Sequence, residues 1–163
     1  MTESVRTALR SLVHGRVDRH DRRVRGFAES EWRRYEDLLA GALLVAARRR
    51  FAPGADQAAV IRFVASARER YDVTGLDVDP TVAEALIRAA LGECPAPPDD
   101  AATLTARTLL LLGLLEDEGM TTAELDDLLT DAWTTAEGEP TAGSPDGTAG
   151  CRSGGGGKFG VSR

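Results

Sequence analysis

The chain has 163 residues, of which 42% are hydrophobic and 28% are charged, and its net charge is −6. This length allows a single domain of ordinary size. Two histidines and two cysteines are too few for the common zinc and di-iron sites, and no spacing marks a nucleophile, a histidine and a carboxylate as a triad. We therefore predict no metal, no cofactor and no catalytic residues.

Charge is distributed unevenly along the chain. Residues 1–71 contain 15 arginines and nine acidic residues, whereas residues 72–163 contain five basic and 17 acidic residues. Such an asymmetry reports on interactions rather than on the fold. We expect the two halves either to face each other or to face different partners.

The apolar composition predicts helices. Alanine and leucine dominate the apolar positions, and valine and isoleucine form no runs with a period of two. The expected fold is all-α, a compact helical bundle of five or six helices with a basic N-terminal helical arm and a disordered Gly-rich C-terminal tail.

Residues 1–26 are predicted to form the basic arm. Val5, Leu9 and Leu12 recur at helical spacing, so a short amphipathic helix opens the chain. Residues 16–25 contain five arginines and only two apolar residues, which indicates a solvated helix or a flexible arm. The candidate phosphate-contacting side chains are Arg19, Arg22, Arg23 and Arg25.

Residues 27–92 are predicted to supply the core helices. Apolar spacing indicates helices over about residues 30–50, 56–71 and 80–91. A candidate N-cap precedes each of them, namely Ser30, Asp56 and Asp79.

The first core helix contains the longest uncharged run of the chain. This run, Leu38–Ala47, has ten residues, fewer than the roughly 20 that a membrane-spanning helix needs. Leu39 and Leu43 lie on the expected inner face of this helix, and Leu44 lies on its flank. The first 26 residues also lack the apolar segment of a secretory signal. We predict no membrane span and a cytoplasmic location.

Two loops are predicted between helices. Asp72, Asp77 and Asp79 cluster around Gly75, but their spacing does not match an EF-hand, so turn and capping roles are expected for them. Residues 93–100 form a Pro-rich linker.

Residues 101–136 are predicted to form an acidic, leucine-rich helical hairpin packed on the core. Gly119 ends its first helix, and a capping box at Thr121–Glu124 begins the second. Leucines surround the first helix, which either lies sandwiched in the bundle or presents a surface to another chain. The candidate partner-binding residues are Leu111, Leu115, Leu125 and Leu129.

The remaining residues suggest little chemistry. Residues 137–163 are rich in Gly, Pro, Ser and Thr and are predicted to be a disordered tail, and their Gly-Lys segment lacks the flanking residues of a phosphate-binding loop. Cys94 and Cys151 are expected to be free thiols in a reducing compartment. His14 and His20 are expected to be solvated.

The sequence supports three functional hypotheses. The first is a non-enzymatic protein-interaction or regulatory protein, which binds another protein or itself through the leucine-rich hairpin and the basic arm. The second is a nucleic-acid-associated regulator that uses Arg16–Arg25. The third is a small helical enzyme with an unrecognised carboxylate site, although no small-molecule substrate is evident. An exposed leucine patch, a basic face or a cleft with converging carboxylates would distinguish them.

Overall fold

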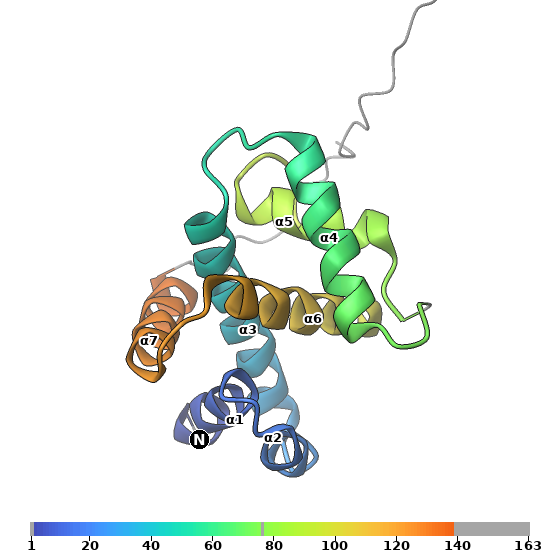
Figure 1. Ribbon diagram of the computed structural model, residues 1–163. Coiled ribbons are helices and arrows are strands. Elements are labelled where there is room, and N and C mark those ends of the chain that lie inside the picture. Colours follow the sequence, from blue (N-terminus) through green and yellow to red (C-terminus); the bar gives the residue numbers. More distant parts are fainter. Residues whose placement is uncertain (1, 76, 139–163) are drawn as a thin grey trace, which may run out of the picture.

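The computed structural model describes residues 2–75 and 77–138, and these residues form seven α-helices and no strand (Figure 1). The helices are α1 (Thr2–Val13), α2 (Val17–Val24), α3 (Glu29–Arg50), α4 (Gln57–Tyr71), α5 (Pro80–Ala90), α6 (Ala101–Glu118) and α7 (Thr122–Gly138). The all-α prediction is confirmed, whereas the predicted count of five or six helices is not. The predictions for the tail beyond residue 138 lie outside the described residues.

The long helix α3 organises the bundle. It packs against α1, α5, α6 and α7, and Figure 1 shows α1 and α2 near the start of α3, with α6 crossing it. Its inner face is formed by Leu38, Leu39, Ala42, Leu43 and Ala46, all of them buried, and Leu44 is only partly buried. The assignment of the inner face from sequence is therefore confirmed.

Two features of the N-terminal region differ from the sequence-based expectation. Helix α1 belongs to the hydrophobic core, because Val5, Ala8 and Leu9 are fully buried, so the core begins well before residue 27. The predicted N-cap at Ser30 is wrong, since α3 begins one residue earlier, at Glu29. The backbone N–H of Ala28 donates instead to the Glu31 carboxylate at 3.1 Å.

The other predicted helix caps are confirmed. Asp56 accepts from the N–H of Ala58 at 3.2 Å, and Asp79 accepts from the N–H of Thr81 at 2.7 Å. Before α7, Glu124 accepts from the N–H of Thr121 at 2.7 Å, and its own N–H donates to the Thr121 hydroxyl at 3.4 Å. These short-range bonds position the helix starts.

Asp72 organises the loop between α4 and α5. Its buried carboxylate accepts from the backbone N–H groups of Asp77 at 3.3 Å and Val78 at 3.1 Å, and from the Thr74 hydroxyl at 3.3 Å. Burial alone would raise the pKa of this carboxyl, but the hydrogen bonds outweigh burial and hold the pKa below its usual value. Asp72 and Asp79 thus have the turn and capping roles expected for them.

Because its folded pKa is lowered, the Asp72 carboxylate stabilises the fold above pH ~4 and loses this effect as the pH falls through the folded pKa. We expect Asp72→Asn to lower the melting temperature at neutral pH. The difference from the parent should shrink as the pH falls below about 4 and through the folded pKa, where the parent carboxylate becomes neutral too. Melting curves across this range check the prediction, with Asp77→Asn, an exposed position in the same loop, as control. A difference that does not change with pH would contradict it.

Two further sequence-based expectations concern the membrane and the cysteines. Among the helices of the described residues, none combines the length and the apolar content that crossing a bilayer requires. The expectation of a free thiol is wrong for Cys94, because its sulfur is engaged in a disulfide bond. Cys151 lies outside the described residues.

Candidate functional site

The opposite charges of the two halves of the chain pair with each other across the bundle. Arginines of α1, α3 and α4 contact carboxylates of α6 and α7, in the pairs Arg10–Asp126 at 2.5 Å, Arg49–Asp131 at 3.2 Å, Arg70–Glu116 at 3.0 Å and Arg70–Asp117 at 2.9 Å. Exposed ion pairs contribute about 0–1 kcal/mol each, so their effect on stability is small. Their main consequence is that they consume much of the basic charge of the first half.

The arginines in and beside α2 form no such ion pair. We call Arg16, Arg19, Arg22, Arg23 and Arg25 the α2 arginines, and all five are exposed. Within the described residues, no carboxylate oxygen lies within 4.0 Å of their side-chain nitrogens. Arg22 alone makes a side-chain hydrogen bond, to the backbone oxygen of Asp18 at 3.1 Å. The α2 arginines therefore present uncompensated positive charge to solvent.

The opposite side of α2 is anchored to α3 through His20. Its Nε2 lies 2.7 Å from the Tyr35 hydroxyl, and its Nδ1 lies 3.0 Å from the carboxylate of Asp21. Burial raises the pKa of Tyr35, so its hydroxyl stays protonated as a partner for the imidazole. The prediction of solvated histidines is wrong, because only 12% of the His20 side chain and 18% of the His14 side chain are exposed.

Aromatic contacts support the same anchor. The rings of Phe27, Trp32 and Tyr35 lie with their centroids 5.6–5.9 Å apart, in edge-on and tilted arrangements. They join the loop that leaves α2 to the first turns of α3. The basic segment is therefore a docked helix, and the α2 arginines have defined positions.

A pocket of about 400 Å³ lies between α1, α2 and the start of α7, and we call it the α1–α2–α7 pocket. It is lined by Thr7, Arg10, Ser11, His14, Arg16, Arg19, Arg23, Thr122 and Asp126. Three of the α2 arginines thus share one pocket, together with a single carboxylate.

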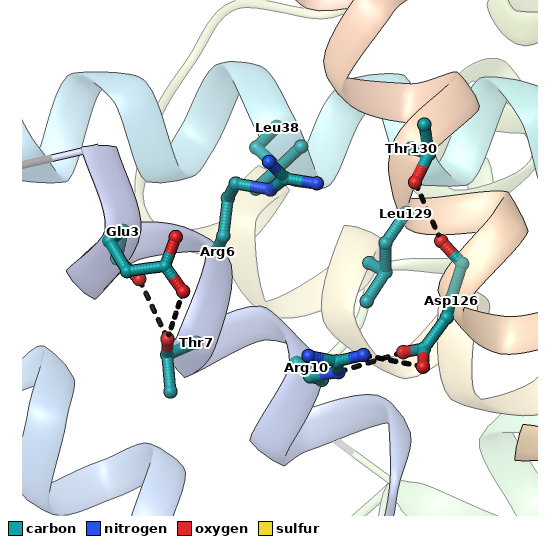
Figure 2. A pocket seen from close by; sticks show the side chains of 8 residues that line it. All are labelled: Glu3, Arg6, Thr7, Arg10, Leu38, Asp126, Leu129 and Thr130. Atoms are coloured by element: carbon teal, nitrogen blue, oxygen red, sulfur yellow. Dashed lines mark hydrogen bonds and ion pairs between the residues drawn. The ribbon is translucent and has the colours of Figure 1, made fainter.

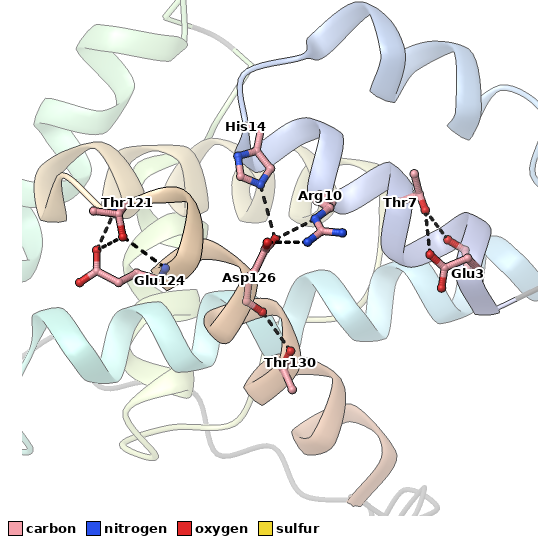
Figure 3. Close-up of polar contacts among 8 residues, drawn as sticks. All are labelled: Glu3, Thr7, Arg10, His14, Thr121, Glu124, Asp126 and Thr130. Atoms are coloured by element: carbon pink, nitrogen blue, oxygen red, sulfur yellow. Dashed lines mark hydrogen bonds and ion pairs between the residues drawn. The ribbon is translucent and has the colours of Figure 1, made fainter.

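The carboxylate in this pocket is already neutralised. Figure 3 shows Arg10 and His14 pointing at Asp126, and Arg10 binds both carboxylate oxygens, with its Nε donating at 2.7 Å. The His14 Nε2 lies 3.6 Å from the same carboxylate. The hydrogen bond from Arg10 is the main reason that the pKa of Asp126 lies below its usual value. With Arg10 and Asp126 balanced, Arg16, Arg19 and Arg23 give the pocket a positive charge.

The basic surface continues beyond the pocket along α2. Arg19, Arg22 and Arg23 line a shallower depression of about 280 Å³, which shares Arg19 and Arg23 with the α1–α2–α7 pocket. Arg25 lines neither of them. Arg16, Arg19, Arg22 and Arg23 thus line a pocket and an open surface that adjoin each other.

A pocket on the other side of Asp126 is balanced in charge. It has a volume of about 270 Å³ and is lined by Glu3, Arg6, Thr7, Arg10, Leu38, Asp126, Leu129 and Thr130 (Figure 2). Two arginines face two carboxylates there, and the Arg6 guanidinium lies 5.4 Å from the ring centre of Trp133. This pocket has no excess charge with which to select an ion.

The leucines predicted to bind a partner lie between the helices of the bundle. Their exposed fractions are 0% for Leu111, 8% for Leu115, 8% for Leu125 and 7% for Leu129. Helix α6 packs against α3, α4 and α5, which explains why leucines surround it. The arrangement matches the sandwiched alternative rather than an exposed leucine surface.

One further cluster contains carboxylates. Asp37 of α3 lies near Asp99 and Arg107, and partial burial, followed by the charge of Asp99, raises the pKa of Asp37. Arg107 is buried in α6 and pairs with Asp99 at 2.6 Å. In the part of the chain that the structure describes, no three His, Cys, Asp or Glu side chains come together as a metal site. The cluster ties α6 to the linker before it.

Comparisons with protein-family models, curated proteins and solved structures found no match to this chain. Of the residues lining the α1–α2–α7 pocket, the sequence analysis singled out Arg19 and Arg23. It could also have identified Arg16, because residues 16, 19 and 23 share one face of a helix. His14 and Thr122 could not have been linked from sequence, since His14 follows α1, Thr122 begins α7, and these two helices meet only in the fold.

Proposed function

We propose that this protein is a non-enzymatic nucleic-acid-binding protein, and that the α2 arginines contact the phosphate backbone. The observation that carries the proposal is the clustering of five exposed arginines, none with a carboxylate partner in the described residues, in and beside one short helix. Arg10, Arg49 and Arg70 pair with carboxylates of the acidic half, whereas the α2 arginines have no such partner in the described residues. A folded, anchored helix with five exposed guanidinium groups is suited to bind a polyanion.

The dimensions of the basic face fit a short stretch of nucleic acid. A helix rises 1.5 Å per residue, so residues 16–25 span about 13 Å. Along the axis of a duplex, each strand presents one phosphate about every 3.4 Å, so this length spans about four phosphates of one strand. Guanidinium groups can donate two hydrogen bonds to one phosphate. Contacts to phosphate carry no direct sequence information, so we expect binding with little sequence preference.

The protein-interaction hypothesis has less support. A protein-interaction surface built from the leucines of α6 and α7 would need them exposed, and they are buried in the bundle. Helix α7 carries Glu124, Asp126, Asp127 and Asp131 and no basic residue, so it would repel a polyanion. Nucleic acid is therefore expected to approach from the α2 side. The net charge of −6 opposes approach from elsewhere. Salt is expected to weaken binding, because contacts between arginine and phosphate release counterions from the nucleic acid.

The test replaces Arg19, Arg22, Arg23 and Arg25 with serine and measures binding of a labelled single strand of about 12 nucleotides by fluorescence anisotropy. The parent should bind at low salt, with a logarithmic salt slope of about −0.7 for each neutralised phosphate. The variant should lose most of this binding and reduce the slope by about three. Circular dichroism checks that the variant remains folded.

The matched control removes the same amount of charge elsewhere. Arg33, Arg34, Arg49 and Arg62 lie on α3 and α4, and replacing them with serine lowers the net charge equally. This variant should bind nearly as well as the parent, with an unchanged salt slope. Absence of binding by the parent at low salt, or equal weakening in both variants, would overturn the proposal.

A further inference from the structure

We infer that the α1–α2–α7 pocket binds a phosphate monoester group, either the terminal phosphate of a nucleic-acid strand or a free nucleoside monophosphate. This inference deepens the proposed function and rests on it where the ligand is a strand end. Three observations carry it: the charge of the pocket, the donors that remain available in it, and the rigid attachment of its walls.

The charge of the pocket favours an anion. Four arginines and one carboxylate, that of Asp126, line the pocket. Arg10 donates two hydrogen bonds to this carboxylate, one to each oxygen. Arg16, Arg19 and Arg23 remain without a carboxylate partner in the described residues. A phosphate monoester carries a charge of about −1.5 to −2 at pH 7, whereas an internal phosphate carries −1. Three guanidinium groups around one pocket match the monoester better.

The donors that remain available are the guanidinium groups of Arg16, Arg19 and Arg23, since Arg10 and His14 both point at Asp126. The Thr7 and Ser11 hydroxyls already donate to backbone oxygens, of Glu3 at 2.7 Å and of Thr7 at 2.8 Å. Thr122 is the first residue of α7, where the helix dipole adds positive potential. The guanidinium groups must therefore supply most hydrogen bonds to a ligand.

The size of the pocket favours the end of a strand over its middle. A volume of about 400 Å³ lies in the range of small-molecule sites, and it would enclose a phosphate with part of its sugar. Internal phosphates are better suited to the open face formed by Arg19, Arg22 and Arg23.

The walls of the pocket are held in place before a ligand arrives. His20 and Tyr35 anchor α2 to α3 with a contact of 2.7 Å, and Arg10 and Asp126 join α1 to α7. Little reorganisation is then needed on binding, which favours affinity.

The experiment compares three single strands of identical sequence, with a 5′-phosphate, a 3′-phosphate or no terminal phosphate, by anisotropy at one salt concentration. One phosphorylated strand should bind about tenfold more tightly than the unphosphorylated one, since charge-assisted hydrogen bonds are the strong ones. Adenosine 5′-monophosphate and adenosine are titrated separately by calorimetry, and only the monophosphate should bind.

Two variants with equal charge change locate the site. Arg16→Ser removes a guanidinium that lines only the α1–α2–α7 pocket, and Arg25→Ser removes one that lines neither pocket. Arg16→Ser should abolish the preference for a terminal phosphate and the binding of the monophosphate. Arg25→Ser should weaken all three strands alike and leave the preference intact.

The outcomes separate this inference from the proposed function. Equal binding of all strands, with no binding of the monophosphate, would overturn the inference and leave the proposed function standing. Binding of the monophosphate that depends on Arg16, without binding of any strand, would support the pocket and overturn the proposed function. If Arg25→Ser lost the preference for a terminal phosphate as fully as Arg16→Ser, the proposed location of the site would be overturned.

Discussion

Replacing Leu39 with alanine is expected to lower the free energy of unfolding by about 2–5 kcal/mol. Leu39 is fully buried on the inner face of α3, the helix that contacts α1, α5, α6 and α7. The substitution removes apolar burial and leaves a cavity that four surrounding helices cannot easily fill. Because domains of this size are stable by only about 5–15 kcal/mol, the loss should be plain in chemical denaturation.

Leu44→Ala provides the matched control. It deletes the same atoms from the same helix, but Leu44 lies on the flank of α3 and is only partly buried. We expect it to cost clearly less than Leu39→Ala, with an unchanged dependence on denaturant. Equal costs at the two positions would show that α3 presents a different face to the core.

Replacing Gly41 with alanine is expected to destabilise the fold even though alanine favours helices. A Cβ atom at Gly41 would lie 2.7 Å from the backbone oxygen of Ala132, so α7 would have to move away from α3. Alanine gains about 1 kcal/mol over glycine in a helix interior, whereas overpacking costs about 1–3 kcal/mol and sometimes more. The backbone of α7 cannot move without disturbing its packing. We therefore expect the steric cost to exceed the gain in helix propensity, so that the melting temperature falls.

Gly113→Ala is the control for this prediction. Its Cβ would lie 3.0 Å from the Cβ of Ala67, a contact between side chains in which α6 and α4 need shift only slightly. Here the gain in helix propensity should offset most of the steric cost, and the melting temperature should change little. A stabilising effect of Gly41→Ala would contradict the close crossing of α3 and α7.

The Gly41 substitution also bears on the candidate site. Helix α7 supplies Thr122 and Asp126 to the α1–α2–α7 pocket, so a displaced α7 would disturb one wall of that pocket. If the inference about the pocket is right, Gly41→Ala should reduce the preference for a terminal phosphate more than it reduces binding to the open face. The anisotropy assay with phosphorylated and unphosphorylated strands measures both.

Much of the secondary structure could be predicted from the sequence because it depends on neighbouring residues. Apolar side chains at helical spacing place the buried faces of α3 and α4. Asp56, Asp79 and the Thr121–Glu124 capping box mark helix starts through bonds that reach at most three residues. Ser30 is not the cap of α3. The Glu31 carboxylate accepts a hydrogen bond from the backbone N–H of Ala28 instead.

The sequence by itself determined the helical class, most helix boundaries and the accumulation of arginine between residues 16 and 25, since each depends on local composition and spacing. Only the tertiary structure decided which charges remain free and which leucines are buried. Arg10 pairs with Asp126, which lies 116 residues further along the chain, and Arg70 pairs with Glu116, 46 residues further along. No local sequence pattern encodes such pairs. Burial of the leucines of α6 is likewise not encoded locally. These leucines belong to the core because three other helices, α3, α4 and α5, pack against α6. Pairing and burial depend on distances in space, and these are defined only once the helices pack.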